Sequence, residues 1–230
     1  ASSCSVYGDG SDYPRSEKDE LKPLTAYAKS KIETELYLRK INNYKKTKIT
    51  SLRFSTACGF SPNLRLDLVL NDFVANALNN NEIEILSDGS PFRPLIDVED
   101  MARSIFWACH RNQGNNFEIL NVGSPNWNYQ IKDLALGVKS ILGDQIKLKI
   151  NTKALPDKRS YKVSFKKFYA IAPHEFTPKI SLEESIIRMV KALTPFRERL
   201  NRKKRNHMIR LEVLKNLKSR FLIDQDLNWL

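Results

Sequence analysis

Apolar residues recur at helical spacing in several long segments of the chain. Between residues 25 and 44, Ile32 and Leu36 fall on one side of a helix, and this segment contains neither Gly nor Pro. Ser181 and Glu184 have the spacing of a capping box at the start of another helix. Similar periodicity predicts helices over residues 66–78, 99–110, 129–142 and 182–194.

Shorter apolar or alternating segments between these helices predict β-strands. The chain opens on residues 1–8, which have the pattern of the end of a buried strand followed by a turn at Gly8. Further strands are predicted over residues 48–54, 82–86, 95–98, 117–122 and 146–150. Strands that alternate with helices in this way indicate an α/β fold with a mostly parallel sheet, followed by a smaller mixed region.

The composition is typical of a globular protein in a reducing compartment. A hydrophobic content of 41% with 10% aromatic residues is enough to bury a core in a chain of 230 residues. No segment approaches the roughly 18 to 20 apolar residues that cross a bilayer, and the first residues do not resemble a signal peptide. Cys4, Cys58 and Cys109 are far apart, so we expect free thiols and no metal site. We therefore expect a soluble, cytoplasmic protein with no membrane partner.

The net charge of +12 favours an anionic partner. The distribution of the charge along the chain indicates which kinds of anionic partner to expect. Residues 195–230 hold ten Lys or Arg against four Asp or Glu, which is half of the net charge. We interpret this run as the solvated face of a basic helical tail. Aromatic residues do not interleave with its cations as stacking platforms would, so we expect no nucleic-acid partner. A non-catalytic module that binds nucleic acid or anionic lipid is the alternative of another class.

Tyr27 and Lys31 are the first candidate catalytic residues. Their four-residue spacing on the predicted helix places both side chains on one face. A phenol with its usual pKa of about 10 is a poor base at neutral pH, but a nearby cation favours its ionised form. Ser3 ends a predicted strand, at the edge where open α/β sheets bind ligands. A serine there can donate to a hydroxyl or carbonyl oxygen of a ligand while Tyr27 moves the proton.

These segments carry a family resemblance. Ser2-Ser-Cys-Ser-Val-Tyr-Gly8, followed some twenty residues later by Tyr27-Ala-Lys-Ser-Lys31, resembles the extended short-chain dehydrogenases of the NAD-dependent epimerase/dehydratase family. In that family the hydroxyl residue five positions before the glycine is catalytic, which corresponds to Ser3. The resemblance implies that Tyr27 and Lys31 contact the cofactor, NAD or NADP. It also implies a Rossmann-like, doubly wound parallel sheet, of which this chain holds the C-terminal part.

The resemblance continues along the chain and implies further site residues. The segment from Leu52 to Gly59 is similar to the family's strand beside the nicotinamide, which implies that Phe54 and Thr56 bind the cofactor, with Ser55 between them. The segment 92–102 resembles R-x-x-x-x-V-x-D, where the arginine, here Arg93, binds the substrate pyrophosphate.

Two later assignments concern the nucleotide and the sugar. Residues 157–167 resemble a segment that closes over the nucleotide, which implies that Arg159 and Tyr161 bind substrate. Arg65 and Asn71 resemble a subgroup pattern near the sugar nucleotide.

The sequence departs from the family in two respects. The G-x-x-G-x-x-G fingerprint and the acidic residue that contacts the ribose are absent. They precede the Ser3 strand in the family, so we expect about 110 residues to be lacking, given the usual size of such folds. Cys4 and Ser5 occupy substrate-binding positions where related 4,6-dehydratases place an Asp-Glu pair. The absence of those carboxylates favours an epimerase or a ketoreductase over a dehydratase.

The resulting hypothesis is a nucleotide-sugar epimerase, most simply a 4-epimerase, that acts by transient oxidation. The alternatives are an NADPH-dependent 4-keto nucleotide-sugar reductase and a dehydratase. Residues 1–60 are assigned to the remaining Rossmann-like half with the catalytic helix. Residues 61–194 form the mixed substrate-binding region, with Rossmann segments returning at about 90–123, and residues 195–230 form the basic tail. The nucleotide-diphosphate sugar is the expected partner, and a homodimer is left open.

Overall fold

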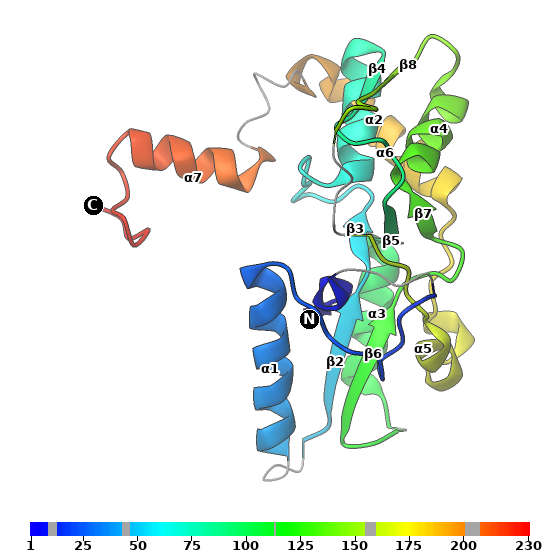
Figure 1. The fold of residues 1–230 in the computed structure, drawn as a ribbon, viewed down its shortest axis with the longest axis vertical. Helices are drawn as coiled ribbons and strands as arrows, with labels where there is room; N and C mark the ends of the chain where they lie inside the picture. The colour runs from blue at the N-terminus through cyan, green and yellow to red at the C-terminus, as the bar shows by residue number, and fades with distance from the viewer. Residues whose placement is uncertain (9–12, 43–46, 113, 155–159, 201–207) are drawn as a thin grey trace.

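The fold was described from a computed structural model of the chain, which is elongated and built in two connected parts (Figure 1). The structure describes residues 1–8, 13–42, 47–112, 114–154, 160–200 and 208–230. One part contains β1, β2 and β6 with α1, α3 and α5, and the other gathers α2, α4 and α6 around β4 and β8. Strands β3, β5 and β7 connect the two parts.

The secondary structure is mixed α/β, as predicted. The strands are β1 (Ser2–Ser3), β2 (Ile49–Phe54), β3 (Thr56–Cys58), β4 (Glu82–Ile85), β5 (Phe92–Asp97), β6 (Phe117–Val122), β7 (Asn128–Gln130) and β8 (Lys147–Ile150). The α-helices are α1 (Ala26–Asn42), α2 (Val69–Asn80), α3 (Val98–His110), α4 (Ile131–Leu142), α5 (Lys166–Ile171), α6 (Leu182–Leu193) and α7 (Arg210–Ser219). The 3-10 helices are η1 (Cys4–Tyr7), η2 (His174–Phe176) and η3 (Thr194–Leu200).

The strands form three small sheets that are parallel except at one pair. The first has the order β1-β2-β6 and is parallel throughout. The second has the order β3-β5-β7, in which β7 pairs antiparallel with β5, and β4 pairs with β8 in the third. Helix α1 packs against β1 and β2, while α3 packs against β2 and β3. The mostly parallel arrangement that the alternating pattern predicted is therefore confirmed.

Local sequence signals set the ends of several helices. Ser181 caps α6 by accepting a hydrogen bond of 3.1 Å from the Glu184 N–H, so the predicted capping spacing is confirmed. Asp97 caps α3 in the same way through the Glu99 N–H, at 2.9 Å. Gly8 ends η1 with a φ of 64°, and a Cβ there would lie 1.6 Å from the Lys22 carbonyl oxygen. Only glycine fits this turn, which brings the chain from β1 back toward α1.

The structure differs from the sequence-based prediction mainly in short elements. Strands β3 and β7 and helix α5 were not predicted, because segments of three to six residues carry little periodicity. The basic tail contains η3 and α7, but residues 220–230 are not helical, and they turn back to form a bridge between Ile223 and Trp229. Helix α7 extends sideways from the rest of the molecule (Figure 1).

Candidate active site

An open cleft of about 1310 Å³ lies where the strands of the first sheet end. Ser3 at the end of β1 is the register partner of Phe54 in β2, and Phe54 is the partner of Val122 in β6. Parallel strands that end together form the edge at which α/β sheets bind ligands. Most of the predicted site residues line this one cleft: Ser3, Ser5, Tyr27, Phe54, Ser55, Thr56, Arg65, Arg93 and Tyr161.

The Ser3 hydroxyl is oriented by the turn that follows β1. Its oxygen accepts a hydrogen bond of 3.2 Å from the Ser5 N–H and another of 2.9 Å from the Ser5 hydroxyl. Ser3 thus caps η1, and Ser5 supports it from within the same turn. Two bonds are accepted, so the O–H of Ser3 is left as the donor that can reach a ligand oxygen in the cleft.

Tyr27 and Lys31 lie in the first turns of α1, and their side chains meet as the spacing predicted. The Lys31 ammonium lies 5.5 Å from the centre of the Tyr27 ring, and it donates a hydrogen bond of 2.9 Å to the Ala1 carbonyl. Tyr27 is 56% exposed and lines the cleft. Lys31 therefore links the start of the helix to the chain just before β1, and it holds a positive charge beside the phenol ring.

Arg65 lies beside Tyr27 on the cleft wall. Its guanidinium donates to both carboxylate oxygens of Asp67, at 3.1 and 2.6 Å. These bonds are the main cause of the raised pKa of Arg65, and the Tyr27 phenol makes a smaller contribution of the same sign. Arg65 thus lines the cleft within electrostatic range of Tyr27, whereas Lys31, also predicted as a site residue, does not line it.

Arg93 and Tyr161 form a separate part of the lining. The Arg93 guanidinium lies 6.0 Å from the centre of the Tyr161 ring and donates to the Phe92 carbonyl at 2.9 Å. Arg93 comes from β5, whereas Tyr161 is held beside that strand by a backbone bond of 3.3 Å to the Phe92 carbonyl. The structure therefore brings these two predicted substrate-binding residues together. Arg159 lies outside the described residues.

Phe54, Ser55 and Thr56 form the floor of the cleft at the junction of β2 and β3. The side chains of Phe54 and Ser55 are buried, and Thr56 is half-buried. Gly123 makes room for them, because a Cβ at that position would lie 2.3 Å from the Ser55 hydroxyl oxygen. This floor of the cleft is therefore closely packed.

Cys4 and Asn71 do not line the cleft, in contrast to the substrate contacts expected from the sequence. Cys4 is fully buried and its thiol donates to the Arg53 carbonyl at 3.0 Å, while burial raises the pKa of the thiol. The Asn71 amide accepts a hydrogen bond from the Gly59 N–H and donates to the Arg65 carbonyl, each at 3.0 Å. Both side chains hold protein segments together, and Asn71 supports the loop that carries Arg65.

A buried ion pair that the sequence analysis missed lies beside the turn that carries Ser3. Glu35 of α1 accepts hydrogen bonds from the Arg53 guanidinium at 2.9 and 2.6 Å and from the Ser2 hydroxyl at 2.6 Å. One carboxylate thereby joins the helix of Tyr27, the strand of Ser3 and strand β2. No local spacing signals this pair, because Arg53 lies 18 residues further along the chain, on a strand.

Tyr7 and Asn121 extend this buried network to β6. The Tyr7 hydroxyl accepts from Arg53 at 3.0 Å and donates to the Asn121 side-chain oxygen at 2.7 Å. Burial raises the pKa of Tyr7, so its phenol stays neutral and can act as a donor. The network ties η1 to β2 and β6 and thereby fixes the end of β1 that carries Ser3.

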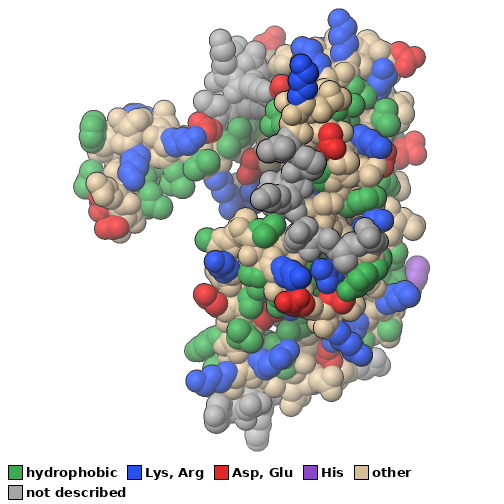
Figure 2. Space-filling view, viewed as in Figure 1, with side chains coloured by type: hydrophobic (Ala, Val, Ile, Leu, Met, Phe, Trp, Pro, Cys, Tyr) green, Lys and Arg blue, Asp and Glu red, His purple; other side chains and the backbone are tan. Residues whose placement is uncertain are grey.

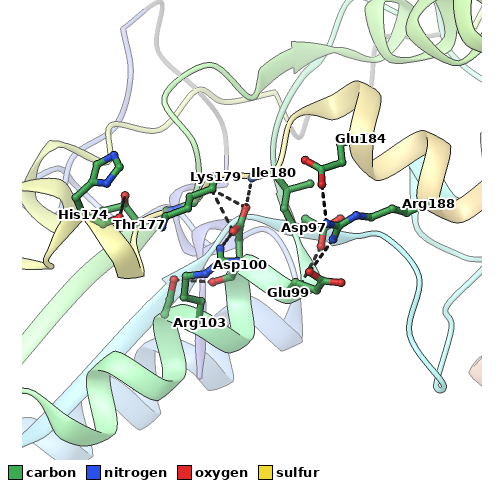
Figure 3. A network of polar contacts seen from close by, with 12 residues as sticks. Asp97, Glu99, Asp100, Arg103, His174, Thr177, Lys179, Ile180, Glu184 and Arg188 are labelled. Atoms are coloured by element: carbon green, nitrogen blue, oxygen red, sulfur yellow. Dashed lines mark hydrogen bonds and ion pairs between the residues drawn. The ribbon is translucent and has the colours of Figure 1, made fainter.

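Three carboxylates at the end of β5 and in the first turn of α3 contact α6 and the segment that precedes it (Figure 3). Asp97 accepts from the Ser185 hydroxyl at 2.6 Å, and Glu99 pairs with Arg188 at 2.6 Å. Asp100 accepts from the backbone N–H groups of residues 179 and 180 at 3.1 Å and also pairs with Arg103. In the sequence analysis, Arg93 was the only residue of segment 92–102 to which a role was assigned. The acidic residues of the same segment also matter, because they connect the two parts of the fold.

The site has the groups for proton transfer and anion binding. It offers two phenols, several hydroxyls, two guanidiniums and four carboxylates in a single cleft. Among the described residues, no group of three or more His, Cys, Asp or Glu could hold a metal ion, and no helix is long and apolar enough to cross a membrane. The arrangement suits acid/base chemistry on a hydroxyl-bearing, anionic ligand.

Comparison with known proteins identifies relatives of both the sequence and the fold. The sequence profile of the NAD dependent epimerase/dehydratase family matches residues 1–123. The chain is 29% identical over 199 residues to a dTDP-4-dehydro-6-deoxyglucose reductase of Escherichia coli. The aligned region covers 82% of the chain and 58% of the reductase. The chain is also 25% identical over 205 residues to UDP-glucuronic acid decarboxylase 3 of Arabidopsis thaliana, which covers 87% and 57%. The chain thus spans less than two thirds of the length of either relative.

A solved structure supports the fold assignment. The UDP-glucuronic acid 4-epimerase of Bacillus cereus, in complex with UDP-glucuronic acid and NAD, superposes with a TM-score of 0.72 at 20% identity. The match covers 85% of this chain and 60% of the epimerase. The Rossmann-like character of the parallel sheet is therefore confirmed.

Proposed function

Because the chain belongs to the NAD-dependent epimerase/dehydratase family, we propose that it supplies the catalytic and sugar-binding part of an NAD(P)-dependent nucleotide-sugar 4-epimerase. The observation that carries the proposal is that the Tyr27 phenol shares one cleft with the Ser3 hydroxyl and with the guanidiniums of Arg65 and Arg93. Such a cleft can bind a diphosphate and expose a sugar hydroxyl to an acid/base at the same time.

In the proposed reaction Tyr27, as phenolate, removes the proton from the sugar 4-hydroxyl. Ser3 donates a hydrogen bond to the same oxygen and steadies it as it becomes a carbonyl. A bound NAD(P), with its nicotinamide beside Tyr27 and Lys31, would supply the acceptor and donor for the hydride of C4, the carbon that bears this hydroxyl. Tyr27 then gives the proton back, so that the net change is inversion at one carbon.

The cations have two proposed roles. Lys31, placed beside the Tyr27 ring and tied to the Ala1 carbonyl, is the group expected to hold the nicotinamide ribose. Arg93 is proposed to bind the substrate diphosphate, because its planar guanidinium lies in the cleft beside the Tyr161 ring. A diphosphate held there leaves the sugar free to turn between the two hydride transfers.

The described residues could bind the nicotinamide end of the cofactor but not its pyrophosphate. The floor formed by Phe54, Ser55 and Thr56 lies next to Tyr27 in the cleft and can accept the nicotinamide ring. The glycine-rich segment that binds a dinucleotide pyrophosphate does not occur in this sequence. We therefore propose that the activity belongs to a polypeptide that also contains a dinucleotide-binding segment.

A 4-keto nucleotide-sugar reductase is the second candidate, and the Escherichia coli relative favours it. Reduction would use Tyr27 as the proton donor and would need no return of hydride. A dehydratase is less well supported, because Cys4 is buried and Ser5 bears no carboxylate. Elimination of water needs an acid/base group at these positions, and neither residue supplies one.

The test is the activity of Tyr27→Phe in the product of the gene's full coding region. We expect its turnover to fall at least about a hundredfold, because a general acid/base typically contributes a factor of 10² to 10⁴. Binding of the nucleotide sugar should change little. The assay follows the epimerisation of UDP- and dTDP-hexoses by proton NMR, which separates the axial from the equatorial product.

Tyr37→Phe is the matched control, since Tyr37 lies on the same helix and its side chain faces solvent. It should retain normal turnover. Near-normal turnover of Tyr27→Phe would contradict the proposed role. Stoichiometric oxidation of NADPH by a 4-keto sugar, without epimerisation of any hexose, would establish the reductase in place of the epimerase.

A further inference from the structure

The first turn of α7 meets the body of the molecule at the cleft. Met208, just before the helix, packs against the hydrophobic core that α2, α4 and α6 share, and Leu200 at the end of η3 is buried in the same core. Figure 1 shows α7 projecting from the body beyond this point, and Figure 2 shows acidic and basic side chains together near the place where the helix joins the body. The core contact of Met208 therefore fixes the position at which α7 starts.

Two side chains at the start of α7 line the cleft that holds Tyr27. They are Ile209 and Glu212, and both are partly buried. Leu211, which lies between them in the sequence, is 60% exposed. The first turn of α7 therefore presents one apolar and one acidic side chain to the cleft, while Leu211 faces solvent.

The start of α7 is linked to the end of the cleft that holds the proposed acid/base. Arg65, within electrostatic range of Tyr27, donates hydrogen bonds to both carboxylate oxygens of Asp67. These bonds are the main cause of the lowered pKa of Asp67, and Arg210 of α7 makes a smaller contribution of the same sign. A series of neighbouring charged side chains therefore connects Tyr27 with the first turn of α7.

The part of the ligand expected at this end of the cleft is the sugar. In the proposed function Tyr27 acts on a sugar hydroxyl, while Arg93, beside the Tyr161 ring, binds the diphosphate. Because the first turn of α7 is linked to Tyr27 through the pair of Arg65 and Asp67, its cleft-lining side chains lie on the sugar side.

The chemistry of these two side chains matches the surface of a pyranose sugar, whose ring has C–H groups on its faces and hydroxyls around its edge. Ile209 offers apolar surface to a ring face. One carboxylate oxygen of Glu212 accepts a hydrogen bond of 2.7 Å from the Lys215 ammonium, which leaves the second oxygen able to accept from a sugar hydroxyl. A hydrogen bond to an ionised acceptor is stronger than one between neutral groups.

We propose that the first turn of α7 forms one wall of the sugar subsite, with Ile209 against the sugar ring and Glu212 accepting a hydrogen bond from a sugar hydroxyl. This role rests on the proposed function, because it takes the ligand of the cleft to be a nucleotide sugar. Helix α7 lies outside residues 1–123, the part of the chain that the family profile matches, so the family assignment does not imply this wall. The start of α7 thus helps to determine which sugars the protein accepts.

Calorimetric titration of the product of the gene's full coding region separates contacts to the sugar from contacts to the nucleotide. The ligands are UDP-glucose with UDP, and dTDP-glucose with dTDP. Glu212→Gln should weaken binding of the nucleotide sugar about tenfold, because a hydrogen bond to a charged group contributes more than one between neutral groups. Ile209→Ala should weaken it about fivefold through loss of apolar contact. Neither variant should change the affinity for the free nucleoside diphosphate.

Two variants of the same helix are matched controls. Lys215→Gln breaks the same exposed ion pair as Glu212→Gln but keeps the carboxylate, and Leu211→Ala shortens a side chain that faces solvent. Both should bind the nucleotide sugar as the parent protein does. In the epimerisation assay Glu212→Gln should raise KM with little change in kcat, since the sugar contact exists in both the ground state and the transition state.

Three results would overturn the proposal. The first is an unchanged affinity for the nucleotide sugar in both Glu212→Gln and Ile209→Ala. The second is equal weakening of the nucleotide sugar and the free diphosphate, which would place α7 beside the nucleotide. The third is an equal loss in Lys215→Gln and Glu212→Gln, which would attribute the effect to the ion pair within the helix.

A failure of the proposed function gives a different result, because the parent protein itself would then bind neither UDP-glucose nor dTDP-glucose. That outcome would overturn the proposed function together with the role of α7. Normal circular dichroism of each variant confirms that the substitutions leave the fold intact.

Discussion

Glu35→Ala tests whether the buried ion pair beside the turn that carries Ser3 stabilises the fold. The side chains of Arg53 and Glu35 are only 3% and 4% exposed, and their closest atoms are 2.6 Å apart. Without the carboxylate, the Arg53 guanidinium keeps the Tyr7 hydroxyl at 3.0 Å as a side-chain partner, and the Ser2 hydroxyl loses its acceptor. Removal of one member of a buried pair costs about 3 to 5 kcal/mol, because the other charge stays buried and uncompensated.

An exposed ion pair of the same length provides the control. Glu99 and Arg188 are also 2.6 Å apart, but their side chains are 59% and 42% exposed. Solvent screening limits such a pair to at most about 1 kcal/mol, so Glu99→Ala should lower the free energy of unfolding by no more than that. The two substitutions therefore remove carboxylates at equal distance from their partners and differ chiefly in burial.

Urea denaturation followed by circular dichroism measures both variants. Glu35→Ala should shift the transition midpoint strongly at an unchanged slope, which would indicate a loss of stability and not of compactness. The double variant Glu35→Leu with Arg53→Met should recover part of the loss, because apolar residues can replace a buried pair at little cost. If Glu35→Ala lost no more stability than Glu99→Ala, the reasoning from burial would be refuted.

Three further predictions follow from the site and the sequence. Arg93→Ala should weaken nucleotide-sugar binding about tenfold or more with a smaller effect on turnover, since a hydrogen bond to a charged group contributes about 1.5 to 3 kcal/mol; a loss of turnover at unchanged affinity would contradict the assignment. Of the three thiols, only the exposed Cys109 should react rapidly with a disulfide reagent at neutral pH, because burial raises the pKa of Cys4 and Cys58 and the thiolate is the reactive form; rapid reaction of all three in the folded protein would refute this. Residues 1–230 alone should bind NADH only weakly and show no epimerase activity, since the sequence has no glycine-rich helix start for the pyrophosphate; micromolar binding in a fluorescence titration would contradict that expectation.

Sequence reasoning succeeded where a feature depends on local spacing. Tyr27 and Lys31 meet because residues four apart share a helix face, whatever the rest of the chain does. Ser3 could be placed in the cleft because the ends of parallel strands meet at one edge. The capping of α6 by Ser181 was readable from its spacing to Glu184.

Sequence reasoning failed where the surroundings of a residue are formed by segments that are distant along the chain. The pairing of Glu35 with Arg53 depends on how α1 packs against β2, and no local pattern encodes that register. Cys4 lies one residue from Ser3, yet it faces the core instead of the cleft because η1 turns its side chain inward. Strand β7 forms by antiparallel pairing with β5, whose paired residues 92–94 come more than thirty residues earlier than residues 128–130.

The carboxylates of Asp97, Glu99 and Asp100 also bear on how the two parts of the fold could move. They contact three successive points of the segment from residue 179 to Arg188. Any movement that separates α6 from α3 would have to break these contacts, whereas a movement that keeps the two helices together would leave them intact. Spin labels on exposed positions of α3 and α6 would show whether the distance between the helices changes when a nucleotide sugar binds.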